Sequence, residues 1–290
     1  MKQLRNSRIL ITGASGWLGR ETLCLLQREV GALGGLNLTL TGSAERRIDI
    51  HGENIKIVRT DQSIEKQAFD LILHFAFITQ EKAFSMGEIA YTQANIELNE
   101  TAQRIALFNS EARQLVLSSG AAKLFLDKNL DSHAKTLYAK LKIDLEEKTQ
   151  DARTLILRLW NTSGHHLGVN PNYAISEFIC AAKKNQNIVI RNNLRRSYVY
   201  SQDVIRASIL FLVDGGSGIT NSGGSITDLS NLAEQVVQIN NSNSEIYFNE
   251  PDNQASLDYL SPISEIPKKY WVQEFDLKQQ IFETSAGIDC

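Results

Sequence analysis

The stretch ILITGASGWLG, from Ile9 to Gly19, leads from an apolar, β-branched run through a glycine turn into a helical pattern. Its glycines stand three residues apart, and each has a distinct use. Gly13 allows a tight turn, Gly16 allows close approach of backbone to ligand, and the last glycine allows close contact between helix and sheet. The helix expected near 17–30 directs free N–H groups and a positive dipole end toward an anion. The stretch therefore predicts a strand, a pyrophosphate-binding turn and a helix.

Through the first half of the chain, short apolar runs alternate with helical patterns. This alternation predicts an α/β fold with a doubly wound parallel sheet that is covered on both faces. The strands are expected near 8–12, 36–41, 54–58, 69–76, 113–118 and 153–160, and the helices near 17–30, 88–109 and 134–150. Ligands of such sheets bind at the carboxyl ends of the strands, so the small and polar residues that end several runs are expected to face a ligand.

Beyond Asn161 the pattern loosens. Helices are expected near 173–185 and 202–213, short strands at 188–190 and 198–200, and a helical and irregular region over 228–290. We therefore expect a dinucleotide-binding Rossmann domain over 1–160, with 198–225 returning to it. A small C-terminal substrate-binding cap is expected over 161–197 and 226–290.

The 290-residue chain is 42% hydrophobic and 22% charged, with a net charge of −3. This balance is typical of a globular protein, and it gives no general electrostatic reason to bind nucleic acid or an anionic membrane. The apolar run at 9–12 is too short for a signal peptide, and no stretch approaches the roughly twenty apolar residues that span a membrane. Cys24, Cys180 and Cys290 are widely spaced. We therefore expect neither a disulfide framework nor a zinc site. We also expect a cytoplasmic location.

Tyr138 and Lys142 are four residues apart in an expected helix, so one helix face carries both side chains. A phenol has a pKa near 10, and proton transfer near pH 7 requires a shift of about three units, roughly 4 kcal/mol. A neighbouring ammonium, helped by a bound cationic nicotinamide, can supply that shift. About twenty residues upstream, Ser118 and Ser119 end an expected strand. A hydroxyl there can bind a substrate oxygen while the tyrosine moves the proton.

With these elements in this order, the chain resembles the short-chain dehydrogenase/reductase superfamily, specifically its extended branch, the NAD-dependent epimerase/dehydratase family. The resemblance covers nearly the whole chain. It implies a Rossmann-type fold whose Gly-x-x-Gly-x-x-Gly turn binds a dinucleotide. It also implies that Tyr138 is the acid/base, that Lys142 lowers its pKa and positions the nicotinamide ribose, and that Ser119 orients the reacting oxygen.

Further segments match the family pattern in the expected order. Residues 61–62 follow the third strand, where the family places an aspartate on the adenine amino group. Residues 74–76 resemble the His-x-Ala ending of strand four, and Asn95 resembles the asparagine of the next helix. Residues 158–161 are similar to Arg-x-Phe-Asn, whose aromatic lies near the nicotinamide and whose asparagine reaches the substrate. Residues 196–203 resemble a segment whose arginine often binds a nucleotide-sugar pyrophosphate.

The resemblance therefore implies two sets of binding residues. The cofactor-binding set is Gly13, Ser15, Gly16, Trp17, Leu18, Gly19, Ser43, Arg46, Asp61, Gln62, Phe75, Ala76, Asn95 and Trp160. The substrate-binding set is Ser118, Asn161 and Arg196. The guanidinium of Arg196 can pair bidentately with phosphate oxygens, although a surface arginine beside other arginines is the alternative. The adjacent His165 and His166 point in different directions without carboxylate–histidine spacing, so no metal is expected.

The end of the fifth strand departs from the family pattern. Where the family has Ser-Ser-x-Ala-Val-Tyr-Gly, residues 118–124 read Ser-Ser-Gly-Ala-Ala-Lys-Leu. Aligning the small residues makes Ser119 the catalytic hydroxyl, whereas a shift by one residue puts Gly120 there and leaves the role empty. Nucleotide-sugar 4,6-dehydratases have an Asp-Glu pair where this chain has Gly-Ala at 120–121. Because eliminating water needs a carboxylic acid and a base, dehydratase chemistry is disfavoured, whereas ketoreduction and 4-epimerisation stay open.

The cofactor preference depends on the end of the second strand, where an Asp or Glu would bind the ribose hydroxyls of NAD. The sequence there is Thr-Gly-Ser-Ala-Glu-Arg-Arg over 41–47. No acid stands at the strand end, and Ser43, Arg46 and Arg47 can neutralise a 2′-phosphate. We expect NADP, while NAD stays possible if Glu45 turns inward.

These observations predict an NAD(P)-dependent oxidoreductase or epimerase that acts on a nucleotide-activated sugar by hydride transfer, with polysaccharide biosynthesis as its setting. A 4-keto reductase is slightly favoured over a 4-epimerase. The alternatives are a reductase of a non-sugar carbonyl and a catalytically silent NADP-sensing regulator of the same fold. The resemblance also implies a homodimer through the helices near 88–109 and 134–150. Leu98, Ile105 and Leu145 would lie in that contact, or else in the core.

Overall fold

A computed structural model of the chain describes residues 1–120, 122, 133–170, 173–249, 258–271 and 275–290. The chain divides into two compact units: Met1–Leu159 with Ser208–Thr220, and Trp160–Ala207 with Asn221–Cys290. The segment that returns to the first unit is shorter at both ends than the expected 198–225. The roles expected for the two units, dinucleotide binding and substrate binding, stay predictions.

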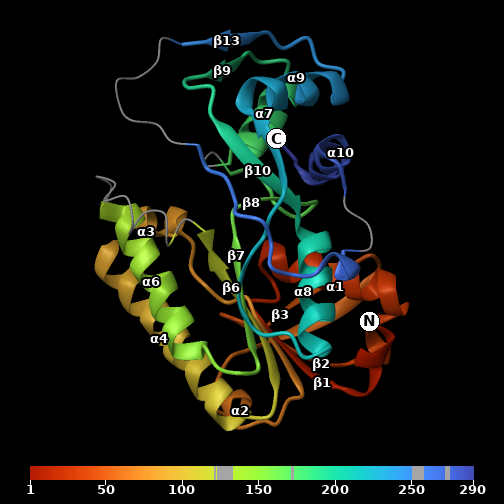
Figure 1. Cartoon of the computed structure of the whole chain (residues 1–290), viewed down its shortest axis with the longest axis vertical. Coiled ribbons are helices and arrows are strands. Elements are labelled where there is room, and N and C mark those ends of the chain that lie inside the picture. The colour runs from red at the N-terminus through yellow and green to blue at the C-terminus, as the bar shows by residue number, and fades with distance from the viewer. Residues whose placement is uncertain (121, 123–132, 171–172, 250–257, 272–274) are drawn as a thin grey trace. The chain divides into compact units, whose positions relative to one another are not determined.

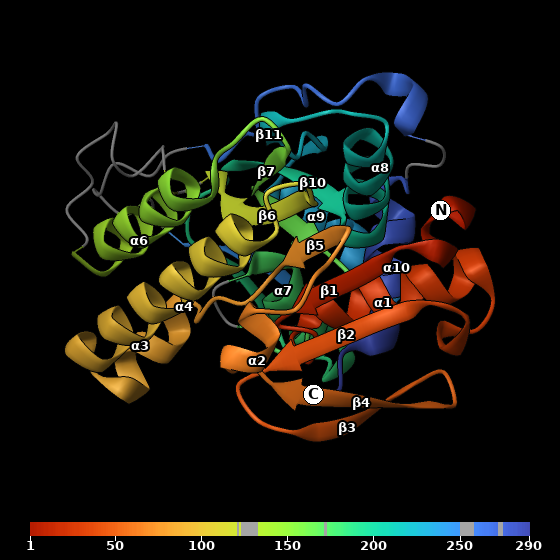
Figure 2. The same cartoon turned by 90° about the horizontal axis from the view of Figure 1, so that it is seen from below.

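The first unit is built on an eight-stranded sheet with the order β11-β7-β6-β5-β1-β2-β4-β3 (Figure 2). Five neighbouring pairs, from β7 through β6, β5, β1 and β2 to β4, are parallel, and β3 runs antiparallel to β4. The strands are β1 Arg8–Thr12, β2 Asn37–Gly42, β3 Arg46–Ile50, β4 Glu53–Arg59, β5 Leu71–His74, β6 Arg113–Ser119, β7 Thr154–Leu159 and β11 Gly218–Asn221. The predicted Rossmann-type α/β class is confirmed.

Helices cover both faces of this sheet, with α4 and α6 side by side on one face and α1 on the other (Figure 1). The helices of this part of the chain are α1 Trp17–Val30, α2 Gln62–Glu65, α3 Gln80–Met86, α4 Glu88–Phe108, α6 His133–Thr149 and α8 Ser201–Val213, with the 3₁₀ turns η1 Lys2–Asn6 and η2 Leu33–Gly35. Helix α1 buries Leu23, Leu25 and Leu26 and ends at Gly31, whose φ of 94° closes the last turn.

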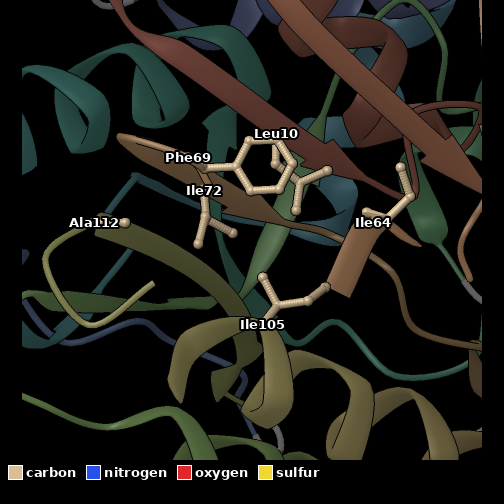
Figure 3. Packing of buried hydrophobic residues seen from close by; sticks show 6 residues of the cluster. All are labelled: Leu10, Ile64, Phe69, Ile72, Ile105 and Ala112. Carbon is tan, nitrogen blue, oxygen red and sulfur yellow. The ribbon is translucent and has the colours of Figure 1, made fainter. Parts of the chain in front are cut away.

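One cluster of the core shows why strands and helices pack as they do. Leu10 of β1 and Ile72 of β5 meet Ile64 of α2 and Ile105 of α4, and all four are at most 8% exposed. Figure 3 shows these side chains together with Phe69 between the strands and the helices. Fully burying an aliphatic or aromatic side chain of this size stabilises the fold by about 1.5–3 kcal/mol. The cluster thereby holds α4 on the sheet.

The second unit contains a three-stranded sheet in the order β12-β10-β8 and a two-stranded sheet of β13 and β9. Its strands are β8 Asn161–Ser163, β9 Ile188–Ile190, β10 Arg195–Tyr200, β12 Ser225–Asp228 and β13 Ile246–Phe248. Its helices are α7 Ala174–Lys183, α9 Leu229–Ile239 and α10 Leu277–Gly287, with the 3₁₀ turn η3 Lys268–Tyr270. Asp276 starts α10 through a capping box with Gln279, so local sequence fixes where this helix begins.

The cysteines correct one expectation. Cys180 of α7 and Cys290 form a disulfide across a sequence separation of 110, whereas Cys24 is free and buried. Sequence spacing could not reveal this pair, because folding brings its Cα atoms to 5.6 Å. With this disulfide present, the cysteines no longer favour a reducing compartment. The cytoplasmic location stays a prediction. Within the described ranges, every helix is too short or too polar to cross a membrane.

The helices α4 and α6 also correct part of the dimer expectation. Ile105 and Leu145 are at most 1% exposed and pack in core clusters, so they are not available to a partner. Leu98 is half-buried, whereas Ile89, near the start of α4, is 84% exposed. The homodimer itself stays a prediction.

Candidate active site

The glycine turn between β1 and α1 is packed so closely that side chains are excluded. Gly13 has a φ of 67°, and a Cβ atom there would lie 2.8 Å from the backbone nitrogen of Ala76. A Cβ atom on Gly19 would lie 2.5 Å from the carbonyl oxygen of Gly13, so this glycine lets α1 rest on the turn. The backbone of Ala14 donates to the Thr41 carbonyl at 3.0 Å, which ties the turn to the end of β2.

The outer side of this turn has the properties of a phosphate cradle. Gly16 is exposed and forms the N-cap of α1, and a Cβ atom there would lie 3.2 Å from the Gly13 carbonyl oxygen. Ser15, Trp17 and Leu18 flank it, each half-buried. The first N–H groups of a helix have no acceptor within the helix and attract anions. These residues therefore fit the pyrophosphate of a dinucleotide, as the sequence predicts.

A buried threonine joins the glycine turn to the end of β5. The Thr12 hydroxyl lies 2.8 Å from Nδ1 of His74 and accepts from the backbone nitrogens of Phe75 and Ala76 at 3.2 Å. Burial lowers the pKa of His74 to about 3, with the nearby Lys142 acting in the same direction. His74 is therefore a neutral structural group. Phe75 and Ala76, both expected at the cofactor, lie directly against Gly13.

Asn95 of α4 is hydrogen-bonded to the backbone just after β5. Its amide oxygen accepts from the backbone nitrogen of Ile78 at 2.9 Å, and its amide nitrogen donates to the carbonyls of Ile78 and Tyr91 at 3.2 Å. The side chain is fully buried. The asparagine thus fixes the segment after β5, and in this structure it is engaged by backbone groups of the chain rather than presented to a ligand.

Residues expected near the adenosine lie at the ends of β2 and β4. Asp61 caps α2 by accepting from the backbone nitrogens of Ser63 and Ile64, and its hydrogen bonds with the Ser63 hydroxyl and these N–H groups lower its pKa. The side chain of Gln62 lies outside the described residues. Ser43 and Arg46 are exposed, and Arg46 belongs to β3 rather than to a loop.

Glu45, the acid whose inward turn would favour NAD, has a lysine partner at the surface. Its carboxylate pairs with Lys56 at 2.9 Å on the exposed β3–β4 hairpin. A surface ion pair of this kind is worth at most about 1 kcal/mol, so it orients Glu45 only weakly. Arg47 donates to Asn54 at 3.1 Å.

Tyr138 of α6 and Ser119 of β6, both predicted as catalytic residues, lie together in this unit. They share a side-chain hydrogen bond, which lowers the pKa of the phenol, but burial is the larger effect and raises that pKa to about 12. Phe77 packs edge-on against the Tyr138 ring, with centroids 5.7 Å apart. The structure thus places the Ser119 hydroxyl beside the tyrosine, and its catalytic role stays a prediction. Ala121 lies outside the described residues.

Lys142 lies one helical turn from Tyr138 but has other partners. Its ammonium donates to the Leu117 carbonyl at 3.0 Å and lies 3.7 Å from the centroid of the Phe77 ring. Burial lowers the pKa of Lys142 to about 7, partly opposed by Glu146. The expected lowering of the Tyr138 pKa by this lysine is not met here, because burial dominates both groups.

Ser118 faces a different group from its neighbour. Its hydroxyl donates to the Glu146 carboxylate at 2.5 Å, and both residues are buried. Arg158 of β7 holds the same carboxylate through two bonds, at 2.9 Å and 2.5 Å. The expected contact between Ser118 and substrate is therefore not supported, because this hydroxyl is committed to a buried network.

The remaining expected residues lie in the second unit, where Tyr259 brings them together. The Trp160 indole packs on the Tyr259 ring at 4.6 Å, and Asn161 donates to the Tyr259 carbonyl at 3.4 Å. Arg196 forms a β-bridge with Tyr259, and burial lowers the pKa of its guanidinium. Next to it, Arg195 pairs with Asp258 at 2.7 Å.

Sequence reasoning missed Phe77, Glu146 and Tyr259. Glu146 carried a signal, since it lies four residues after Lys142 and eight after Tyr138, which places all three on one helix face. Phe77 and Tyr259 carried none, because their contacts join segments distant in sequence.

Comparisons with known proteins bear on the family and the fold. The model of the NAD dependent epimerase/dehydratase family matches residues 9–223. No curated protein matches the sequence. The UDP-N-acetylglucosamine 4-epimerase of Methanobrevibacter ruminantium M1, solved with UDP-N-acetylmuramic acid, is similar in structure, with a TM-score of 0.76, 18% identity and 97% coverage of both chains.

Two further epimerase structures are similar. The UDP-glucose 4-epimerase of Thermotoga maritima, solved with UDP-glucose, has a TM-score of 0.73 at 17% identity and covers 96% of this chain and 97% of its own. The UDP-glucose 4-epimerase of Thermus thermophilus, solved with NAD, has a TM-score of 0.70 at 17% identity, with 97% and 98% covered. At such identities these likenesses show the fold, whereas the family model spans most of the sequence. The chain therefore belongs to the NAD dependent epimerase/dehydratase family.

Proposed function

We propose that this protein is an NAD(P)-dependent enzyme that modifies a nucleotide-activated sugar by hydride transfer at a ring carbon. The observation that carries the proposal is the Tyr138–Ser119 pair, with Lys142 one turn along the same helix, in the unit that also contains the glycine turn. An acid/base, an orienting hydroxyl and a dinucleotide cradle are the groups that such a reaction requires.

Each group has a defined task. A bound nicotinamide dinucleotide supplies the hydride donor or acceptor. Gly16 and the start of α1 bind its pyrophosphate. Ser119 orients the reacting oxygen of the sugar, and the Tyr138 hydroxyl gives a proton to that oxygen or removes one from it. Lys142 positions the nicotinamide ribose.

Ketoreduction at the sugar C4 is the reaction we favour, with 4-epimerisation second. Both need only hydride transfer and the tyrosine proton relay. Dehydration also needs a carboxylic acid and a base after the catalytic serine, and this chain has Gly120 and Ala121 at those positions.

The second unit supplies the proposed substrate residues, Asn161 and Arg196. A guanidinium pairs well with the two phosphates of a nucleotide sugar. Support comes from the structural neighbours, because the Methanobrevibacter and Thermotoga enzymes were solved with UDP-sugars. We propose that Trp160, which packs on Tyr259, is a nicotinamide-binding residue.

NADP is the proposed cofactor. Support comes from Ser43 and Arg46, which are exposed after β2, and from the nearby acid Glu45, which pairs with Lys56. The Thermus neighbour was solved with NAD, so the two dinucleotides have to be compared directly.

Thermal unfolding of the wild-type chain with a panel of nucleotide sugars tests this proposal. NADPH should raise Tm by at least about 2 °C and more than NADH does, and a UDP-sugar should raise it further. Adding the matching 4-keto sugar should cause oxidation of NADPH. Stabilisation by NADPH without binding or turnover of any nucleotide sugar would contradict the proposal and favour a cofactor-sensing regulator.

A further inference from the structure

Helix α6 and the end of β6 are joined by three contacts. Tyr138, Lys142 and Glu146 follow one another at intervals of four residues along one face of α6. They contact three consecutive residues of β6: Tyr138 bonds to Ser119, Lys142 to the Leu117 carbonyl, and Glu146 to the Ser118 hydroxyl. Along the helix, Glu146 lies farthest from Tyr138, and both Glu146 and its partner Ser118 are buried.

The carboxylate of Glu146 binds two neighbouring strands at once. Ser118 of β6 and Arg158 of β7 are register partners in the parallel sheet, and both donate to this carboxylate. The ion pair is buried, since the side chains of Arg158 and Glu146 are only 14% and 4% exposed. A buried pair of this kind contributes little net stability, but removing one partner leaves a buried charge unpaired. Such a pair fixes geometry.

Glu146 also affects the charge of Lys142. Lys142 is 5% exposed, and its ammonium lies over the Phe77 ring and donates to a backbone carbonyl. Among the described residues, Glu146 on its own helix raises the pKa of Lys142, whereas His74 on β5 stays neutral because burial lowers its pKa. Glu146 therefore provides the negative charge that opposes the effect of burial.

We propose that Glu146, held by Arg158, is a positioning residue for the nicotinamide-binding lysine and for the serine end of β6. It acts through Lys142 and Ser118 rather than on the substrate. The proposal rests on the proposed function for the identity of the reaction, but not for the contacts that carry it. It assigns a role to a buried acid that the proton relay does not use.

The test is the affinity for reduced dinucleotide as a function of pH, followed by cofactor fluorescence, in the wild type and in Glu146→Gln. Protonated Lys142 favours binding, so affinity should fall as pH rises through its pKa. Without the carboxylate charge, the midpoint of this fall should move down by about one pH unit. The value of kcat at pH 7 should fall by about tenfold or more. Asp144→Asn is the matched control, because Asp144 is on the same helix and pairs with Lys148 at 2.9 Å.

An unchanged midpoint in Glu146→Gln, or an equal shift in Asp144→Asn, would overturn the proposal. If Glu146→Gln does not fold, the double variant Glu146→Gln/Arg158→Met removes both buried charges and is expected to fold. Its midpoint should also move down, and a wild-type midpoint would overturn the proposal. Failure of the proposed function would look different: no nucleotide sugar would be turned over by the wild type, while the binding midpoints would still differ between the variants.

Discussion

At the scale of single residues, the neutral His74 makes stability depend on pH. In the folded protein burial lowers its pKa to about 3, whereas an unfolded chain has a histidine pKa of 6.5. Above pH 6.5 neither state binds this proton, so His74 has no effect there. As the pH falls below 6.5 the unfolded state binds the proton first, and the free energy of unfolding decreases toward pH 3.

We therefore expect His74→Gln to flatten the acid side of the stability profile. The histidine should account for a loss on the order of 2–3 kcal/mol between pH 6.5 and 4.5. Urea unfolding of the wild type and the variant at several pH values measures this loss. His51→Asn is the control, because His51 is exposed and has a φ of 44°, which asparagine tolerates. Parallel profiles for wild type and His74→Gln would contradict the account.

Ser118 and Ser119 show what a sequence can and cannot reveal about residues. The pair was recognisable because two hydroxyl residues end an expected strand about twenty residues before the Tyr-x-x-x-Lys helix. Their different partners, Glu146 for one and Tyr138 for the other, depend on how α6 lies on β6. The direction of a side chain at a strand end depends on tertiary packing, which the sequence does not show. For this reason both serines were expected to contact the substrate.

At the scale of elements, the disulfide ties the segment after α10 to α7. Cys290 bonds to Cys180, Lys183 donates to the Ile288 carbonyl at 2.6 Å, and Ile288 is buried. Helix α10 in turn holds the segment after β8, since Thr284 accepts from the backbone nitrogen of Gly164 at 3.1 Å. The bridge therefore stabilises an element that packs next to the proposed substrate residue Asn161.

Reduction should destabilise this arrangement. A bridge that closes a loop of about 110 residues contributes about 2–4 kcal/mol, mainly by restricting the unfolded chain. We expect dithiothreitol to lower the free energy of unfolding of the wild type by this amount and to leave Cys290→Ser unchanged. Cys24→Ala, which alters only the free cysteine, should respond to the reductant like the wild type. A wild type indifferent to the reductant would contradict the expectation.

The elements that sequence patterns predicted are those with long apolar periods, such as α1, α4 and the parallel strands. The short strands β3 and β8 were not predicted, because β3 reads Arg-Arg-Ile-Asp-Ile and β8 reads Asn-Thr-Ser, without the apolar run that marks the equally short β9, Ile-Val-Ile. Strand β3 matters most for the site, since it moves Arg46 from an expected loop into a hairpin. The C-terminal region, expected as helical and irregular, contains α9, α10 and short strands.

At the scale of the whole molecule, the fold and the family followed from the order of motifs rather than from any one of them. The glycine turn, the serine strand end and the Tyr-x-x-x-Lys helix occur in one unit, and the family model spans both units in part. The contacts of Tyr259 could not be foreseen, because they join Trp160, Asn161 and Arg196 to a segment some sixty to one hundred residues away.

Turnover of the matching nucleotide sugar by Tyr138→Phe, measured beside its affinity for NADPH, tests the central claim most directly. The substitution removes the proton-transferring hydroxyl and keeps the ring that packs on Phe77. We predict that kcat falls by at least about 100-fold while NADPH affinity stays within about threefold of the wild type. Tyr91→Phe, which alters another buried tyrosine of the same unit, should retain turnover. Wild-type turnover by Tyr138→Phe would contradict the account.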